Sequence, residues 1–192
     1  MKLIEKNITK NCSEKEIIEI LTLDGKKILE LGCGAASNTR VIAKTGINRE
    51  ITAMEIDEIQ HNKNLRINDL DNVEFVLSGA QEIPVSDNSF DVVFMFKSLH
   101  HVPSELMSKA FEEIKRVLKP KGFVYISEPL FYGEYNDLLK IFHDEQKVRQ
   151  NAFNMIEKFV NNNEFSSYKE IYTNLCVTKT KNPAKKRGFI LL

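Results

Sequence analysis

The segment Ile-Leu-Glu-Leu-Gly-Cys-Gly at residues 28–34 constrains the fold of this chain more than any other feature. An apolar run ends there in an acid and passes at once into two glycines, which is typical of a buried strand followed by a tight turn. Glycine allows positive φ angles and lets a ligand approach the backbone closely. Residues 35–44 can begin a helix whose free N–H groups face the same crevice. The segment therefore predicts a nucleotide-like ligand at the carboxyl edge of a parallel sheet, although an ordinary tight turn would also fit these residues.

Composition excludes several classes of protein. The 192 residues suffice for one domain with a sizeable core, and 42% of them are hydrophobic, as in ordinary globular proteins. Lys plus Arg number 27, as do Asp plus Glu, so charge gives no reason to expect nucleic acid as the main ligand. The three scattered cysteines lack zinc-ligand spacing and favour free thiols, and no metal site is expected. No apolar run reaches the roughly 20 residues that a membrane span needs. We therefore expect a cytoplasmic protein without a membrane span.

Strand-like and helix-like patterns alternate over residues 27–127. Short apolar runs predict five strands, at 27–31, 51–56, 73–77, 90–96 and 123–127. Helical spacing predicts helices between them, at 38–44, at about 58–67 and from Pro103 to Val117. Because strands that alternate with helices form βαβ units with right-handed crossovers, we expect an α/β fold with a parallel sheet and helices on both faces.

The rest of the chain departs from this alternation. Residues 119–122, Lys-Pro-Lys-Gly, predict a turn before the fifth strand. Apolar positions from Leu138 to Phe159 predict one long amphipathic helix or two shorter ones. Residues 171–178 and 188–192 predict two last strands, which a short loop would make antiparallel. No linker or repeat interrupts the chain, so residues 1–192 are expected to form a single domain.

Two features of the glycine turn and the next strand narrow the ligand. In the dinucleotide fingerprint small residues recur at positions one, three and six, whereas position six counted from Gly32 is Ser37, which argues against NAD. Glu55 ends the second predicted strand, where an acid can accept both hydroxyls of a ribose. Asp57 is the competing candidate, but it also fits the N-cap of the next helix. We therefore assign the ribose to Glu55.

Further motifs follow the later strands and give the chain a dense resemblance to one family. From Lys27 to Pro129 it resembles class I S-adenosylmethionine-dependent methyltransferases, specifically the broad bacterial group that includes the ubiquinone/menaquinone-biosynthesis C-methyltransferases. The segments ILELGCG, AMEID, DNSFDVV, LHHV and RVLKPKGFVYISEP stand in the order and spacing of that family. Five motifs in register are far more specific than any one of them.

The resemblance implies both a fold and a cofactor. The fold would be a Rossmann-like, seven-stranded, mostly parallel sheet with helices on both faces and an antiparallel last strand. The cofactor would be S-adenosyl-L-methionine, with S-adenosyl-L-homocysteine as the product. The implied cofactor residues are Glu30 for the amino group, Gly32 and Gly34 for the methionine and ribose portions, Cys33 in the same turn, Glu55 for the ribose hydroxyls, Ile56, Gly79, Ala80 and Gln81 around the adenine, and Lys97 near the methionine end.

Two residues depart from the family pattern. A third glycine is usual where this chain has Ala36, and alanine should be tolerated there unless φ must be positive. An aspartate that accepts from the adenine amino group is frequent where this chain has Gly79. Losing one such hydrogen bond would weaken cofactor binding by about 1 kcal/mol.

Three residues are candidates for catalysis. An in-line methyl transfer mainly needs the nucleophile held at about 3 Å in a desolvated pocket, and a general base helps only where the nucleophile must lose a proton. His100 and His101 follow the fourth predicted strand, and Glu128 ends the fifth, so all three are expected at the same edge. The alternative is that the two histidines only shape the cofactor loop, because this pair recurs in family members with unlike substrates.

The acceptor is expected to be a small molecule, bound under a helical lid at residues 130–169. Methylation of protein or RNA and a non-catalytic role as a partner subunit are the alternatives. The Asn-Pro-Pro-Tyr-type motif of amino-group methylation is replaced by Lys97-Ser98-Leu99-His100, which weakens the case for adenine or glutamine as acceptor. Nucleic acid is not an expected partner, and a homodimer is left open.

Overall fold

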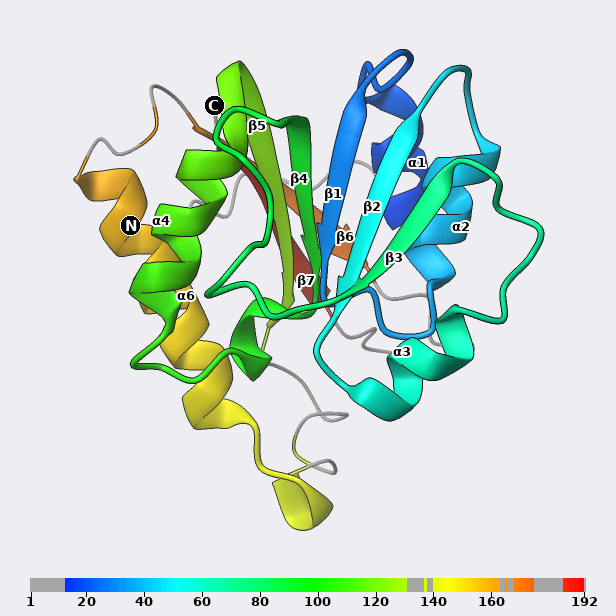
Figure 1. The fold of residues 1–192 in the computed structure, drawn as a ribbon. Helices are drawn as coiled ribbons and strands as arrows, with labels where there is room; N and C mark the ends of the chain where they lie inside the picture. Colours follow the sequence, from blue (N-terminus) through cyan, green and yellow to red (C-terminus); the bar gives the residue numbers. More distant parts are fainter. Residues whose placement is uncertain are drawn as a thin grey trace.

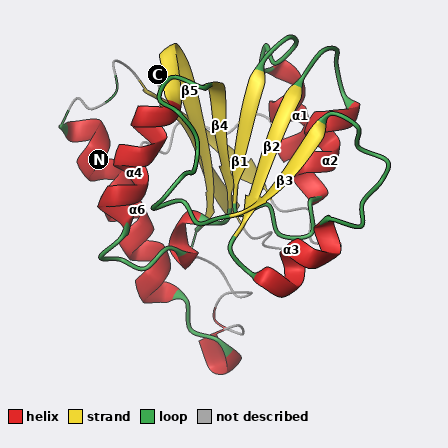
Figure 2. Cartoon of the chain, viewed as in Figure 1, coloured by secondary structure: helices red, strands yellow, loops and turns green. Residues whose placement is uncertain are grey.

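The fold is a central sheet with helices on both sides (Figures 1 and 2). The structure is a computed structural model and describes residues 13–130, 137, 140–162, 165, 168–174 and 185–191. Within these residues no helix is long and apolar enough to cross a membrane.

Five parallel strands form the centre of the sheet: β1 (Lys27–Leu31), β2 (Glu50–Glu55), β3 (Val73–Leu77), β4 (Phe90–Phe96) and β5 (Leu118–Pro129). Their order is β3-β2-β1-β4-β5, and each neighbouring pair is parallel. Apart from Asp91, every residue of β4 is buried, as expected of a strand that helices cover on both faces. The predicted Rossmann-like α/β fold with a parallel sheet is confirmed.

Two apolar cores lie on opposite faces of the sheet. On one face α1 (Glu14–Ile20) and α2 (Ser37–Lys44) bury Ile17, Ile18 and Ile42 against the strands. On the other face α4 (Met107–Val117) and α6 (Gln146–Asn161) pack together, with the rings of Phe111 and Phe159 stacked at a centroid distance of 4.3 Å. Helix α3 (Glu58–Asn64) and the 3₁₀ helix η1 (Leu99–His101) follow β2 and β4 directly and lie at the carboxyl edge.

Two later strands extend the sheet beyond β5. The backbone places β7 (Lys185–Leu191) beside β5 and β6 (Tyr168–Asn174) beside β7, so the order continues β5-β7-β6. β7 is antiparallel to both of its neighbours. The loop predicted around residues 175–184 lies outside the described residues.

Three boundaries differ from the sequence prediction. The turn predicted at 119–122 is instead a bulge inside β5, because Leu118 pairs with Phe90 and Phe123 with Val92, and the residues between them are skipped in the strand register with β4. The helix predicted from Pro103 begins only at Met107, because the Pro103 carbonyl accepts from the N–H groups of both Leu106 and Met107 in a preceding turn. The helix predicted to reach residue 67 ends at Asn64.

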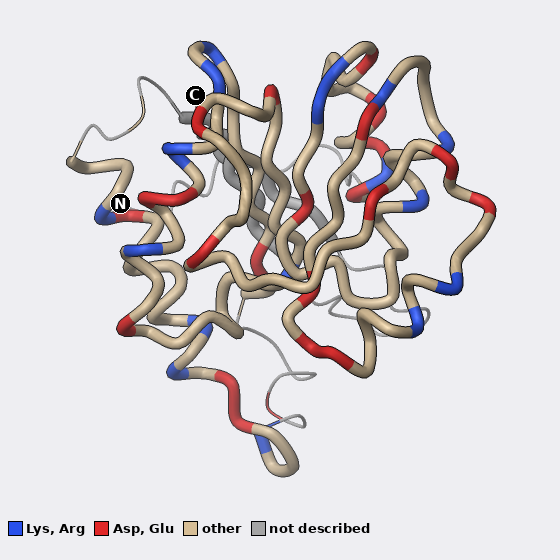
Figure 3. Tube along the Cα trace, in the orientation of Figure 1, with Lys and Arg blue, Asp and Glu red and all other residues tan. Residues whose placement is uncertain are grey.

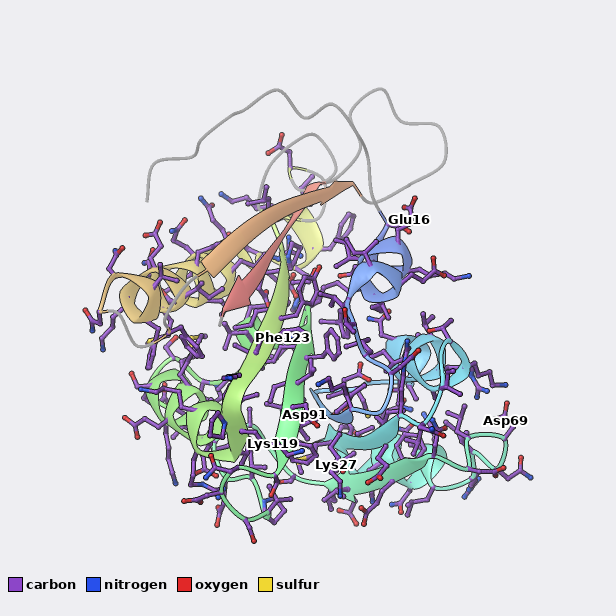
Figure 4. The ribbon with its side chains drawn as sticks, turned by 90° about the horizontal axis from the view of Figure 1, so that it is seen from above. Glu16, Lys27, Asp69, Asp91, Lys119 and Phe123 are labelled. Atoms are coloured by element: carbon purple, nitrogen blue, oxygen red, sulfur yellow. The ribbon has the colours of Figure 1, made fainter. Side chains whose placement is uncertain are left out.

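The two edges of the sheet have different roles. At the amino edge Asp91 Oδ2 accepts from the Lys27 N–H and from Lys119 Nζ, both at 2.9 Å, and so joins the beginnings of β1, β4 and β5 (Figure 4). At the carboxyl edge β1 lies between β2 and β4. Strands β2 and β3 are added on one side of β1, and β4 and β5 on the other, so the order in which strands are added reverses next to β1. Ligands of such sheets bind in the crevice at this reversal point.

Candidate functional site

A pocket of about 930 Å³ lies at the carboxyl ends of β1, β2 and β4. Its volume falls within the range of about 300–1,000 Å³ that is usual for small-molecule sites. Of the residues predicted to form the site, all but Glu128 line this pocket: Glu30, Gly32, Cys33, Gly34, Glu55, Ile56, Gly79, Ala80, Gln81, Lys97, His100 and His101.

The two glycines of the turn after β1 serve different needs. Both have positive φ, +73° at Gly32 and +53° at Gly34. A Cβ on Gly32 would lie 2.5 Å from the Cβ of Ser98, whereas a Cβ on Gly34 would have no atom within 4 Å. Gly32 is therefore required by close packing against the segment after β4. Gly34 leaves the backbone open to the pocket.

Ala36, which stands where a third glycine is usual, has a strained backbone. It is the N-cap of α2 and has φ 58° and ψ 29°, in the left-handed region. A residue with a Cβ is disfavoured there by about 1–2 kcal/mol. Alanine is expected to be tolerated at this position unless φ is positive, and φ is positive here.

Glu55 is held by three backbone N–H groups. Its Oε2 accepts from Gly34 N at 2.7 Å, and its Oε1 accepts from Ile56 N and Asp57 N, both at 2.9 Å. Because each carboxylate oxygen can accept about two hydrogen bonds, Oε2 retains one site for a ligand and Oε1 retains none. Asp57 caps α3 by accepting from Gln60 N at 2.8 Å and does not line the pocket, which confirms the capping interpretation for this acid.

Glu30 is an acid buried beneath the glycine turn. It is 1% exposed, and its Oε2 accepts from the hydroxyl of Thr39 at 2.6 Å. The pKa of Glu30 is raised to about 8, chiefly by burial; the hydrogen bond from Thr39 lowers it, and the carboxylates of Glu14 and Glu55 add to the increase. Near neutral pH Glu30 therefore carries a proton that a cation in the pocket could displace.

Cys33 is a structural member of the turn. Burial raises the pKa of its thiol to about 12, so the thiolate needed for nucleophilic attack is absent at neutral pH. The amide of Asn64 lies 3.5 Å from its sulfur and donates to the Gly34 carbonyl at 2.8 Å, which connects the turn to α3.

The walls near Glu55 are apolar on one side and amide-bearing on the other. Ile56 is 64% exposed at the rim, although it is a large hydrophobic residue. Ala80 is buried, and the side-chain amide of Gln81 lies where a Cβ on Gly79 would be, with its Oε1 2.5 Å from that position. A flat apolar ring could contact Ile56 on one face and this small-residue wall on the other.

The segment after β4 crosses the middle of the pocket. Lys97 has φ 56°, which is uncommon for a residue with a side chain, and its N–H donates to the Ser127 carbonyl at 2.7 Å. The hydroxyl of Ser98 donates to the Leu31 carbonyl at 2.7 Å. These two bonds fix the ends of β1, β4 and β5 relative to one another, and the strained backbone at Lys97 is typical of a ligand-binding position.

A buried histidine–glutamate pair lies at the other end of the pocket. His100 Nδ1 is 2.5 Å from Glu128 Oε2, and Glu128 Oε1 accepts from the Leu99 N–H at 2.9 Å. Glu128 is fully buried, whereas His100 lines the pocket. An acceptor opposite Nδ1 holds the proton on that nitrogen and leaves Nε2 as the ring's accepting atom. Glu128 therefore acts on the pocket through His100.

The exposed His101 stands beside this pair and near the beginning of α6. Its ring centroid lies 4.1 Å from that of His100, and partial burial of the ring is the main cause that lowers the pKa of His101. Glu145 forms an ion pair with Arg149 and lies 3.2 Å from His143 Nε2. Arg149 itself lines the pocket, so this end carries side chains from η1, β5 and α6.

Sequence reasoning missed several pocket residues. Ser37, Asn38, Ser98, Leu106 and Arg149 also line the cavity. Ser37, Asn38 and Ser98 directly follow recognised motifs, so their positions could have been found from the sequence. Leu106 and Arg149 could not, because only the packing of α4 and α6 brings them to the pocket.

Comparisons with known proteins identify the family of this chain. The profile of a family described as "Methyltransferase domain" matches residues 29–126. Glycine/sarcosine/dimethylglycine N-methyltransferase of Actinopolyspora halophila is 32% identical over 108 residues, which cover 54% of this chain and 19% of that protein.

Two further relatives have a similar sequence identity to this chain. Sterol 24-C-methyltransferase ERG6A of Gibberella zeae is 36% identical over 124 residues (61% of this chain, 31% of that protein). Demethylmenaquinone methyltransferase of Staphylococcus haemolyticus is 34% identical over 107 residues (54% of this chain, 44% of that protein). The chain thus spans about a fifth to just under a half of the length of these relatives.

Solved structures support the fold. The YcgJ protein of Bacillus subtilis superimposes with a TM-score of 0.69 over 91% of this chain and 95% of that one, at 16% sequence identity. A likeness at this identity concerns the fold alone. The family profile covers just over half of the chain, and the chain therefore belongs to the methyltransferase-domain family of class I S-adenosylmethionine-dependent enzymes.

Proposed function

We propose that this chain transfers a methyl group from S-adenosylmethionine to a small-molecule acceptor by in-line displacement. The observation that carries the proposal is the pocket at the carboxyl edge, which joins the glycine turn, Glu55 and the histidine pair in one cavity. A sulfonium supplies a methyl carbon that is already activated. The residues of this chain then need only bind, orient and exclude water.

The cofactor end of the pocket fits this ligand in shape and charge. The open backbone at Gly34 admits a ribose, and the remaining acceptor site on Glu55 Oε2 suits one ribose hydroxyl. Bidentate binding, as expected from the sequence, would require Oε1 to release Ile56 N or Asp57 N. We assign the adenine to the space between Ile56 and the wall of Gly79, Ala80 and Gln81.

The methionine portion falls between Glu30 and Lys97 in this proposal. Loss of the proton from Glu30 would give a buried carboxylate for the cofactor's ammonium group. Gly32 and Cys33 line the pocket without large side chains, and Lys97 directly follows the end of β4. The cofactor's charges thus meet an acid and a backbone turn rather than a hydrophobic wall.

We assign the acceptor to the end of the pocket that holds His100 and His101. Glu128 is a positioning residue in this proposal, because it touches His100 and not the cavity. We keep residues 130–169 as the helical lid over this end. Of that range α6 contributes Arg149 to the lining, and residues 131–136, 138–139, 163–164 and 166–167 lie outside the described chain.

A small-molecule acceptor is supported by two observations. The names of the three relatives above refer to glycine and its methylated forms, to sterols and to demethylmenaquinone. The chain has a formal net charge of +0, and Lys, Arg, Asp and Glu are interspersed in the view of Figure 3. Methylation of protein or RNA, and a non-catalytic partner role, remain the alternatives.

Three finer expectations belong to the same proposal. We propose that the working enzyme has the seven-stranded sheet with an antiparallel last strand, supported by the pairing of β7 with β5 and β6. A cytoplasmic location and a homodimer stay predictions. Light scattering of the purified protein tests whether it is a homodimer.

Calorimetric titration with S-adenosylmethionine and S-adenosylhomocysteine tests the function. Both ligands should bind with one site per chain, and Glu55→Ala should abolish most of the affinity. A screen of small molecules with a labelled methyl group then identifies the acceptor. Absence of binding at millimolar cofactor would contradict the enzyme proposal, and binding without transfer to any small molecule would favour the alternatives.

A further inference from the structure

We propose that a divalent transition-metal ion of the Zn²⁺ type binds between His100, His101 and Glu145 at the acceptor end of the pocket. One ligand atom from each of these side chains lies within 4.8 Å of the other two. Two imidazole nitrogens and one carboxylate oxygen are a donor set that suits Zn²⁺, Co²⁺ and related ions. No motif spacing in the sequence predicts this set, because Glu145 is far from the histidine pair along the chain.

The separation of the three groups requires only side-chain movement. With bonds of about 2.0–2.2 Å, ligand atoms around a tetrahedral ion lie roughly 3.4 Å apart. An adjustment of about an ångström therefore closes the cluster on an ion. His101 is exposed, so its side chain has room to rotate. Glu145 lies just before α6, and its carboxylate would have to shift from its ion pair with Arg149.

The second independent observation is the group behind His100. Histidine ligands usually donate their other N–H to a carboxylate, which fixes the tautomer and the ring orientation. Glu128 accepts in this way at His100 Nδ1, at 2.5 Å, and is itself fixed by the Leu99 N–H. This fully buried carboxylate leaves His100 Nε2 as the free ring nitrogen. The ring is therefore already oriented as a ligand.

The groups around the proposed metal site determine its affinity for the ion and the side on which one coordination position stays open. Glu145 also contacts His143 through Oε1, at 3.2 Å, and Arg149 through Oε2. The guanidinium of Arg149 opposes a nearby cation, so we expect micromolar affinity rather than the tighter binding of structural zinc sites. His100, His101 and Arg149 line the cavity, so the position not filled by protein faces the acceptor. Three protein ligands with one open position are typical of catalytic sites.

The role of this ion rests on the proposed function and names the class of acceptor. A hydroxyl or thiol of the acceptor would coordinate at the open position, where its pKa falls and its proton leaves to solvent. The resulting oxygen or sulfur lone pair forms the bond to the methyl carbon. The bond from that carbon to the sulfonium sulfur breaks, its electron pair stays on sulfur as a neutral thioether, and the metal keeps its oxidation state.

Titration of the full, metal-free chain with Co²⁺, followed by visible absorption, tests the site. We expect d–d bands of a four- or five-coordinate ion at one equivalent, without the thiolate charge-transfer band that cysteine ligands would give. Zn²⁺ should displace the signal. The variants are His101→Gln and Glu145→Gln in the cluster, Glu128→Gln behind it, and His143→Gln as the control, since His143 is a histidine that contacts Glu145 Oε1 but is not one of the three proposed ligands.

The expected pattern is specific. His101→Gln and Glu145→Gln should weaken Co²⁺ binding at least 10-fold, Glu128→Gln about 10- to 100-fold, and His143→Gln by less than 3-fold. Because His101 is exposed, its variant should fold normally, which thermal unfolding checks. Absence of Co²⁺ and Zn²⁺ binding at 100-fold excess over protein, or equal binding by all variants, would overturn the proposal. Cofactor binding by the metal-free chain in that case would leave the methyltransferase function standing, whereas metal binding without cofactor binding would do the reverse.

Discussion

The two ends of the pocket are built in different ways. The core of the cofactor end consists of backbone N–H groups, glycines and the acids Glu30 and Glu55, supplied by the ends of β1 and β2 and the turns after them, while Gly79, Ala80 and Gln81 follow β3 and Lys97 follows β4. The acceptor end consists of side chains from η1, β5 and α6, among them His100, Glu128 and Arg149. A backbone site can be specified by one short segment, whereas a side-chain site depends on several packed elements. The cofactor end should therefore be little affected by substitutions at the acceptor end.

The largest expected effect concerns the buried acid of the cofactor end. The unfolded chain ionises Glu30 above about pH 4.5, while the folded chain holds the proton to about pH 8. The unfolded state therefore binds fewer protons between these values, and stability falls with rising pH by up to about 1.4 kcal/mol per unit. Glu30→Gln cannot titrate, so its free energy of unfolding should exceed that of the wild type increasingly from about pH 5 to pH 8.

Urea unfolding across that pH range measures the difference. Glu50→Gln is the matched control, because Glu50 is an exposed acid on β2. It should follow the wild-type curve. Parallel curves for Glu30→Gln and the wild type would show that Glu30 is ionised in the fold.

At the acceptor end Glu128→Ala should destabilise the fold by about 4 kcal/mol, because it leaves a buried histidine and the Leu99 N–H without their partner. Glu128→Gln, which keeps an acceptor, should cost less. If the two ends are independent, cofactor affinity should stay within about 3-fold of wild type in whichever variant remains folded. A loss of cofactor affinity comparable to that of a Glu55 variant would break the distinction between the ends.

Glu55→Ala should lower the affinity for S-adenosylmethionine about 100-fold, since a hydrogen bond to a charged acceptor contributes about 1.5–3 kcal/mol. Asp57→Ala is the matched control two residues away. It should cost about 1 kcal/mol of stability through the lost cap of α3 and leave affinity unchanged. Calorimetry would count against the ribose assignment if the two variants bound the cofactor equally well.

The two glycines should separate packing from strain. Gly32→Ala places a Cβ 2.5 Å from Ser98 Cβ and should destabilise by about 2–3 kcal/mol. Gly34→Ala has open space and should cost only about 1 kcal/mol, from its positive φ. Adding Ser98→Gly should recover part of the loss at Gly32 and none at Gly34. Thermal unfolding of the two single and two double variants decides between clash and strain.

The smallest effect is expected at Ala36→Gly. Glycine relieves the left-handed backbone but increases the entropy of the unfolded chain, so the net gain should be below about 1 kcal/mol. A loss of more than that amount, measured by urea unfolding, would mean that the buried methyl group of Ala36 contributes more to packing than its backbone costs.

Local patterns predicted the parallel sheet well. The bounds of β1, β3 and β4 agree with the apolar runs at 27–31, 73–77 and 90–96. In β1 and β4 nearly every residue is buried, whereas no residue of the edge strand β3 is buried. The failures lie where chain pairing overrides local chemistry. Residues 119–122 have a turn composition, yet they lie inside β5 because strand pairing continues on both sides of them.

The candidate site divides in the same way. The sequence predicted the cofactor end: Gly32, Gly34 and Glu55 follow from strand ends that share one edge of a parallel sheet, and Glu30 follows from the family resemblance. The sequence placed His100, His101 and Glu128 at the same edge, but only the tertiary structure decided the contacts of the acceptor end. The contact between His100 and Glu128 joins two strand exits, and Arg149 and Glu145 reach the pocket because α6 packs on η1. Such contacts depend on side-chain packing between segments far apart in the chain, and no local spacing encodes them.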